Sequence, residues 1–357
     1  MSKKKKKISK NKLGIDLEQL VFGMIEELSK RSKDIVVKRF NFNRDERAKT
    51  LEEIGSEYEI TRERVRQIEF EAISRLKSIG EKRNIDKVFK SIENNIKSYG
   101  GITGEEKITN HLFGEKNDDK INKQITLFIL SLDDRIKETA ETKIHKKVYF
   151  YEEENVERFK NVIKVIEEHL KEKKNSVNFD EILEVASRHF GNKGKFSPLH
   201  LESYLDENKV ILKNILGQWG HTKWSYINPK NVRDKAYLSL KKNEEPLHFI
   251  EITDKINELW QGNRIANNQT VHNELIKDDR FVLVGRGTYA LKEWGYNPGT
   301  VLDVIIGLLK EDNGEMEQSK IVQEVFKRRQ VKKNTIVLNL QNKKYFEKFP
   351  NKIYRLR

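Results

Sequence analysis

The chain has 357 residues, of which 35% are charged and 36% hydrophobic. This length allows two or three ordinary domains, or several small ones. Lys and Arg number 70 against 56 Asp and Glu, a formal net charge of +14 that indicates a polyanionic partner, most often nucleic acid. Cysteine is absent, which excludes disulfides, thiol nucleophiles, iron–sulfur clusters and Cys-based zinc sites.

The remaining residue patterns favour no catalytic class. The eight histidines are scattered and form no HExxH or HxxxH pair, so we expect no metal and no cofactor. We find no Gly-rich phosphate loop and no Ser/His/Asp order, and we expect the chain not to be an enzyme. The longest apolar runs, at 125–132 and 301–309, are too short to span a membrane.

The positive charge is concentrated at the two ends. Residues 1–80 have a net charge of +6, residues 321–357 a net charge of +9, and the middle a net charge of −1. Residues 1–14 contain the run Lys3–Lys7 and are predicted to form a disordered basic arm. Such an arm holds phosphates without reading sequence, or serves as a solubilising tail.

Residues 15–80 have the periodicity of several helices. Apolar residues from Leu17 to Leu28 recur at three- and four-residue spacing, and Ser29 is placed to cap a second helix. Thr50 and Glu53 form a capping box, and Thr61 caps the helix after it. Between these two helices lies a short turn, and Gly55 allows them to approach closely.

The helix after Thr61 has two distinct faces. Its inward stripe is predicted to be Val65, Ile68, Ala72 and Leu76. The opposite face carries Glu63, Arg66, Gln67 and Phe70. Two short helices, a tight turn and such a polar face indicate a helix-turn-helix, whose Arg, Gln and Glu side chains suit guanine, adenine and cytosine. The alternative is a charged helical hairpin with a merely solvated outer face.

Specific motifs in this segment resemble the fourth conserved region of housekeeping-type bacterial sigma factors. The resemblance covers residues 17–80, less than a quarter of the chain. It is carried by Asp45-Glu-Arg, by Thr50-Leu-Glu-Glu-Ile-Gly and by Thr61-Arg-Glu-Arg-Val-Arg-Gln-Ile-Glu.

This resemblance implies functional residues. The second helix would enter the major groove of the promoter −35 element, with Arg62, Glu63 and Gln67 reading bases. Backbone phosphates would be held by Thr50, Arg64 and Arg66. The helices of 17–40 and the segment after Arg75 would grip the β flap of RNA polymerase. Phe70 departs from the family pattern, where a small or polar residue is usual; it would touch a thymine methyl or pack against a following domain.

From residue 84 the chain shows a weak internal repeat. Each repeat begins with helical periodicity and ends in two short strands, the last of which contains a tyrosine, at 147–150, 223–227, 287–291 and 352–356. This is the plan of a winged helix. We therefore predict winged-helix units at 84–152, 155–229, 231–296 and 297–357.

The last two units carry further signals. Residues 231–296 resemble HARE-type winged-helix domains, as in the delta subunit of bacterial RNA polymerase, through the segments 246–252, 270–275 and 280–291. In the fourth unit, 332–342 is a candidate recognition helix with Ile336 and Leu340 in the core. A secondary DNA contact is predicted at Lys333, Asn334, Asn339, Lys343 and Lys344.

These observations predict a mainly α protein, with a sigma-like helix-turn-helix followed by tandem winged-helix units. We expect a cytoplasmic, nucleoid-associated DNA-binding transcription factor that binds double-stranded DNA and docks on RNA polymerase, without membrane contact. No counterpart of the sigma region that melts the −10 element is recognised, so we do not expect it to open promoters alone. The alternatives are a polymerase accessory or antagonist subunit acting by protein contacts, and a divergent sigma factor.

Overall fold

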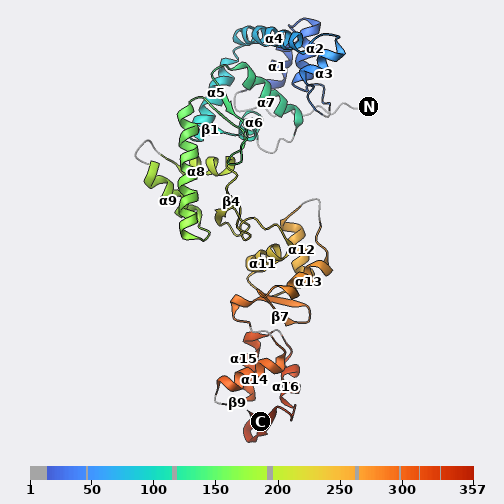
Figure 1. The fold of residues 1–357 in the computed structure, drawn as a ribbon, viewed down its shortest axis with the longest axis vertical. Helices are drawn as coiled ribbons and strands as arrows, with labels where there is room; N and C mark the ends of the chain where they lie inside the picture. The colour runs from blue at the N-terminus through green and yellow to red at the C-terminus, as the bar shows by residue number, and fades with distance from the viewer. Residues whose placement is uncertain are drawn as a thin grey trace. The chain divides into compact units, whose positions relative to one another are not determined.

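The computed structural model describes residues 14–45, 47–114, 119–190, 196–261, 265–296, 299–312, 314–329 and 331–357. The predicted arm at 1–14 lies almost wholly outside these residues. The predicted fold class is confirmed, because the described residues form mainly helices with small antiparallel sheets. The chain divides into two compact units, 1–211 and 212–357 (Figure 1).

The first unit begins with four helices, and a polar residue caps the start of each one. Side chains of Asp16, Ser29, Thr50 and Thr61 accept hydrogen bonds from the first turns of the helices that follow them. The helices are α1 (Leu17–Ile25), α2 (Lys30–Arg39), α3 (Leu51–Glu57) and α4 (Arg62–Lys82).

A second group of elements continues the first unit. Its three strands form one sheet in the order β1-β3-β2, in which Tyr149 of the central strand faces Thr103 and Glu138. The elements are α5 (Asp86–Ser98), β1 (Ile102–Thr103), α6 (Glu105–Phe113), α7 (Lys120–Leu132), β2 (Lys137–Thr139) and β3 (Val148–Phe150).

One hydrophobic core joins these two groups. Met24 of α1 and Leu76 of α4 belong to the same buried cluster as Ile125 and Phe128 of α7. Helices α1, α4 and α7 lie side by side in the upper part of Figure 1. The two groups, which are 15–80 and 84–152 in the sequence, therefore do not have separate cores.

The first unit ends with α8 (Glu153–Lys173), α9 (Phe179–Phe190) and α10 (Pro198–Glu207). Strands β4 (Ile211–Lys213) and β5 (Trp219–His221) pair as a two-stranded sheet. The prediction of a strand at 223–227 was wrong, because these residues form turns. Asn228 and Ile227 both donate backbone hydrogen bonds to Trp224, which coils the segment instead of extending it.

The second unit contains two further groups of helices with three-stranded sheets. The first has α11 (Val232–Asn243), β6 (Leu247–His248), α12 (Phe249–Leu259), α13 (Asn268–Lys277), β7 (Phe281–Gly285), β8 (Thr288–Leu291) and a 3-10 helix (Lys292–Trp294). The second has α14 (Val301–Glu311), β9 (Glu315–Glu317), α15 (Gln318–Arg328), α16 (Lys333–Leu340), β10 (Phe346–Phe349), a 3-10 turn (Pro350–Lys352) and β11 (Ile353–Leu356).

Two tight hairpin turns join strands in this unit. Gly287 links β7 to β8 with a positive φ of 66°, so the Gly285-Arg286-Gly287 segment is a turn. Asn351 and Lys352 link β10 to β11, and both have left-handed backbone conformations. The resemblance of 231–296 to HARE-type domains stays a prediction.

Candidate nucleic-acid interface

The connection between α3 and α4 is a tight turn ended by a left-handed residue. Glu59 has φ of +54°, and the Ile60 N–H donates to the Gly55 carbonyl at 2.9 Å. The Glu59 N–H points to the Ser56 carbonyl at 3.4 Å, which completes the two bonds of a Schellman motif. Four residues, 58–61, therefore separate the two helices, and the last of them is the Thr61 cap of α4.

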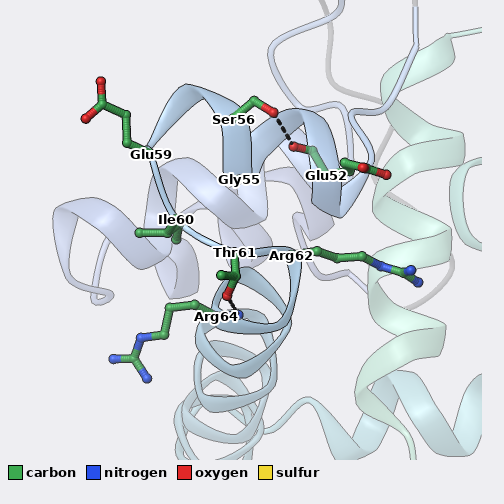
Figure 2. Close-up of a pocket in the computed structure, with 8 residues that line it drawn as sticks. All are labelled: Glu52, Gly55, Ser56, Glu59, Ile60, Thr61, Arg62 and Arg64. Carbon is green, nitrogen blue, oxygen red and sulfur yellow. Dashed lines mark hydrogen bonds between the residues drawn. The ribbon is translucent and has the colours of Figure 1, made fainter.

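Gly55 is required where α3 passes over this turn. A Cβ atom at position 55 would lie 2.8 Å from the Ile60 carbonyl oxygen and 3.5 Å from the Arg62 nitrogen. Because both atoms are backbone, no rotamer change would relieve the contact. Figure 2 shows Gly55 above Thr61 and Arg62 at the start of α4, in an open hollow between the helices. The close approach predicted from the sequence is confirmed.

Helix α4 has the two faces that its sequence predicts. Val65, Ile68, Ala72 and Leu76 are buried. Val65 and Ile68 pack with Ile35 and Ile54. Ala72 and Leu76 belong to the cluster that includes α1 and α7. The opposite face points to solvent, since Arg62, Glu63, Arg66 and Gln67 are all exposed.

The three predicted base-reading residues, Arg62, Glu63 and Gln67, lie within the first two turns of α4. At 100° per residue they share a face about 140° wide. Arg62 makes no ion pair with any described carboxylate, so its guanidinium is available to a ligand. In Figure 2 the Arg62 and Arg64 side chains extend to different sides of the first turn. Arg64 therefore flanks this face on the side of Gln67.

The other polar residues of this face are paired with one another. Arg66 donates to both carboxylate oxygens of Glu63 at 2.9 and 2.7 Å, and Arg64 donates to Gln67 Oε1 at 3.0 Å. The Arg66 guanidinium lowers the pKa of Glu63 below its usual value, so this carboxylate is ionised at neutral pH. Phosphates and bases would have to compete with these pairs for Arg66, Glu63 and Gln67.

Thr50, a predicted phosphate contact, is occupied in its own capping box. Its hydroxyl accepts from the Glu53 N–H at 3.2 Å and donates to Glu53 Oε2 at 3.0 Å. Arg47 donates to the same carboxylate, one bond being 2.9 Å. The Arg47 guanidinium is the first cause of a Glu53 pKa of about 2. Sequence reasoning missed Arg47, because its partner is six residues away across a loop and outside helical spacing.

Phe70 is an exposed aromatic side chain on the outer face of α4. Phe70 is 68% exposed, and its neighbours on this face, Glu63 and Gln67, are polar. At about 80° from Arg62 around the axis and two turns further along, it lies on the same face as the predicted readers. Of the two roles proposed for it, packing against a following domain is not seen among the residues that the structure describes.

Part of the segment predicted to hold the β flap is packed against the chain itself. Leu17, Val21 and Met24 of α1 are buried in the core that includes α7. The ring of Phe128 in α7 lies 5.1 Å from that of Phe40, edge-on. Lys77, in the segment after Arg75, forms an ion pair with Asp134 at 2.5 Å.

The predicted secondary DNA contact lies in the second unit, on α16 and just after it. Lys333, Asn334, Lys343 and Lys344 are exposed. Asn339 is only partly exposed and donates its amide to the Thr335 carbonyl at 2.8 Å. This amide therefore serves its own helix, and Asn339 differs from the other four residues.

Comparison with known proteins identifies the segment that contains α4. Residues 24–78 match the sigma-70 region 4 family. Over 63 residues the chain is 46% identical to the RNA polymerase sigma factor RpoD of Helicobacter pylori. Over 70 residues it is 44% identical to sigma factor SigA of Nostoc sp., and over 71 residues it is 34% identical to sigma factor RpoS of Coxiella burnetii.

These similarities are confined to the region 4 segment. They cover 18–20% of this chain and 9%, 17% and 20% of the three sigma factors. The predicted resemblance to sigma region 4 is confirmed, and it indicates a DNA-binding, transcription-related role. In the part of the chain that the structure describes, no helix is long and apolar enough for a membrane crossing, and no three His, Asp or Glu side chains are grouped as metal ligands.

Proposed function

We propose that this chain is a DNA-binding transcription factor whose region 4 segment reads a promoter −35-like element. One observation carries the proposal. The first two turns of α4 expose Arg62, Glu63 and Gln67 on one face, while the opposite face is held in the core. A recognition helix places its N-terminal residues against base edges in just this way.

The roles of the individual residues follow from their contacts. Arg62, the reader without a described ion-pair partner, suits bidentate pairing with guanine O6 and N7. Gln67 suits adenine, and Glu63 accepts from cytosine N4. Arg64, which flanks this face, and Arg66, which lies within it, hold phosphates. Thr50 is the weakest candidate of the set, because its hydroxyl is used in the capping box.

The proposal is tested with a duplex selected by footprinting and a scrambled duplex of equal length. Arg62→Ala and Gln67→Ala should each cost about 1–3 kcal/mol of binding free energy on the selected duplex and leave the scrambled duplex almost unaffected. Lys82→Ala is the matched control, because this exposed lysine lies at the other end of α4, roughly 30 Å away. If both variants bind each duplex as tightly as the parent does, base reading is refuted.

We also propose that the chain contacts RNA polymerase and modifies initiation without opening promoters alone. The proposal rests on the sigma factors to which residues 24–78 are similar. The buried state of Leu17, Val21 and Met24 means that a flap bound to α1 would have to displace α7 or use other surfaces. We propose, too, that the chain is not an enzyme.

Pull-down of core polymerase by the full chain tests the contact, and permanganate footprinting tests promoter opening. We expect core enzyme to be retained and thymines near −10 to stay unreactive with core and this chain alone. Thymine reactivity in that mixture would make the chain a divergent sigma factor. Failure to retain core enzyme would leave a DNA-binding regulator that works without direct polymerase contact.

A further inference from the structure

Three parts of the chain share one strand arrangement. In each three-stranded sheet the last strand of the part is central, as the orders β1-β3-β2, β6-β8-β7 and β10-β11-β9 show. The central strand carries a buried tyrosine opposite the first strand: Tyr149 opposite Thr103, Tyr289 opposite Leu247 and Tyr354 opposite Met316. Helices α7, α13 and α16 precede the last two strands and so occupy the same place in the three parts.

The helix at this position has a different surface in each of the three parts. Helix α7 is buried along most of its length, including Ile125 and Phe128 in the core shared with α1. Helix α13 exposes Gln269, Asn273 and Ile276 and carries few cations. Of the three helices, only α16 is both exposed and flanked by lysines on both sides.

The charge of the last part is distributed unequally. Residues 331–357 contain eight Lys and Arg and one Glu. On the side of α14 and α15 three of the cations are ion-paired, in Lys320–Asp312 at 2.7 Å, Lys327–Glu324 at 2.6 Å and Arg328–Glu311 at 2.9 Å.

The lysines around α16 and the hairpin β10–β11 are not paired in this way. Six of them are exposed, and none forms an ion pair with a carboxylate among the described residues. They are Lys332, Lys333, Lys343, Lys344, Lys348 and Lys352. Uncompensated cations close to one another in a small domain repel each other, and a bound polyanion would remove that repulsion.

We propose that α16 and the hairpin β10–β11 form a second binding site for double-stranded DNA, separate from α4. Helix α16 lies in the major groove, with Lys333, Asn334 and Lys344 at its phosphates. Leu338, 65% exposed in the middle of α16, faces the groove. Lys348 and Lys352 of the hairpin contact the neighbouring backbone.

The ligand is duplex DNA because of the shape of the surface. An exposed helix fits the major groove of B-form DNA, which is about 12 Å wide, whereas the major groove of A-form RNA is too narrow for side chains to read. Binding is largely independent of sequence, because lysines contact phosphates that every duplex presents. The site extends the proposed function and does not depend on base reading by α4.

Two double variants with equal charge change test the site in the full chain. Lys333→Gln/Lys344→Gln removes two unpaired lysines, and Lys320→Gln/Lys327→Gln removes two paired ones. The measurement is fluorescence anisotropy with a scrambled duplex of about 30 base pairs between about 50 and 200 mM salt. Thermal melting checks that both variants fold as the parent does.

The first variant should make the log–log salt slope shallower by up to roughly 1.8, which is two phosphate contacts at about 0.9 each. The control variant should keep the parent slope. Equal slope changes in both variants, or none in either, would overturn the proposal. So would an equal loss of binding to duplex RNA of the same length, since the surface would then hold any polyanion.

The same experiment separates this site from the proposed function. Arg62→Ala should reduce discrimination between the selected and scrambled duplexes and leave the effect of Lys333→Gln/Lys344→Gln in place. If Arg62→Ala changes nothing while the lysine variant weakens binding, base reading by α4 fails and the α16 site stands. If the lysine variant changes nothing while Arg62→Ala reduces discrimination between the duplexes, the α16 site alone is refuted.

Discussion

Arg66 holds Glu63 with two parallel hydrogen bonds, 2.9 and 2.7 Å long, across one turn of α4. Both side chains are 58% exposed, so the pair adds little to the stability of the fold. Its position on the proposed DNA-reading face gives it another consequence. The free helix presents these two residues as a neutral pair, and in the proposed complex Arg66 would exchange Glu63 for phosphate.

Glu63→Gln should therefore raise affinity for a scrambled duplex and lower the ratio of selected to scrambled binding. The change removes a negative charge from the face and frees Arg66 for phosphate. Glu81→Gln, an exposed substitution of equal charge in the last turns of α4, is the control and should leave that ratio unchanged. Titration of both duplexes with each variant measures the effect, and a preserved ratio in Glu63→Gln would show that Glu63 reads no base.

Substitutions in the α3–α4 turn should act in opposite directions. Gly55→Ala places a Cβ 2.8 Å from the Ile60 carbonyl and should destabilise the first unit by about 1–3 kcal/mol. Glu59→Gly removes a side chain from a left-handed backbone position and should stabilise it by up to about 1 kcal/mol. Urea unfolding followed by circular dichroism measures both, and a neutral Gly55→Ala would mean that the turn can open without cost.

The Glu53 carboxylate should make the first unit sensitive to acid. Its pKa of about 2 lies below the value of 4.5 for a free side chain, because Arg47 and Thr50 donate to the ionised form. The stability that it contributes is complete above pH 4.5 and is lost as the pH falls through about 2. Glu53→Gln should flatten the melting temperature between these pH values. A parallel pH profile for parent and variant would place the acid sensitivity elsewhere.

Glu207 should show the opposite pH dependence. Burial raises the pKa of this carboxyl, which accepts the Gly104 N–H at 3.0 Å. The folded chain therefore favours the protonated form, so its contribution is present below pH 4.5 and is lost as the pH rises through the folded pKa. Glu207→Gln mimics the protonated form and keeps an acceptor for Gly104. It should melt at or above the parent temperature at neutral pH, and a clear drop would show that the negative charge itself is needed.

Phe128→Ala should disconnect α7 from the helices before it. Phe128 is fully buried against Phe40 and Phe42, with ring centroids 5.1 and 5.5 Å away. Removal of such a ring costs about 3–5 kcal/mol of unfolding free energy. Phe326→Ala, at a residue 46% exposed in α15, is the control. Hydrogen exchange of α1 should accelerate in Phe128→Ala, and unchanged protection there would mean that α1 and α4 are stable without α7.

The sequence by itself determined the helix-turn-helix. Asp16, Ser29, Thr50 and Thr61 cap helices through bonds to residues three positions away, so their effect can be read locally. The buried stripe of α4 was predictable for the same reason, because helical periodicity repeats every 3.6 residues. The strand proposed at 223–227 failed, since a segment as short as Lys-Trp-Ser-Tyr-Ile can extend or coil, and hydrogen bonds back to Trp224 coil it.

Only the tertiary structure decided which surfaces remain free. Helices α1 and α7 are about a hundred residues apart in the sequence, and no local pattern shows that they share a core. The same holds for the pairing of cations: Arg328 reaches Glu311 across 17 residues, while Lys333 and Lys344 meet no described carboxylate. Burial and ion pairing depend on contacts between distant segments, whereas capping and periodicity depend on neighbours. The sequence therefore located the exposed polar face of α4, and the fold distinguished α16 from α7 and α13.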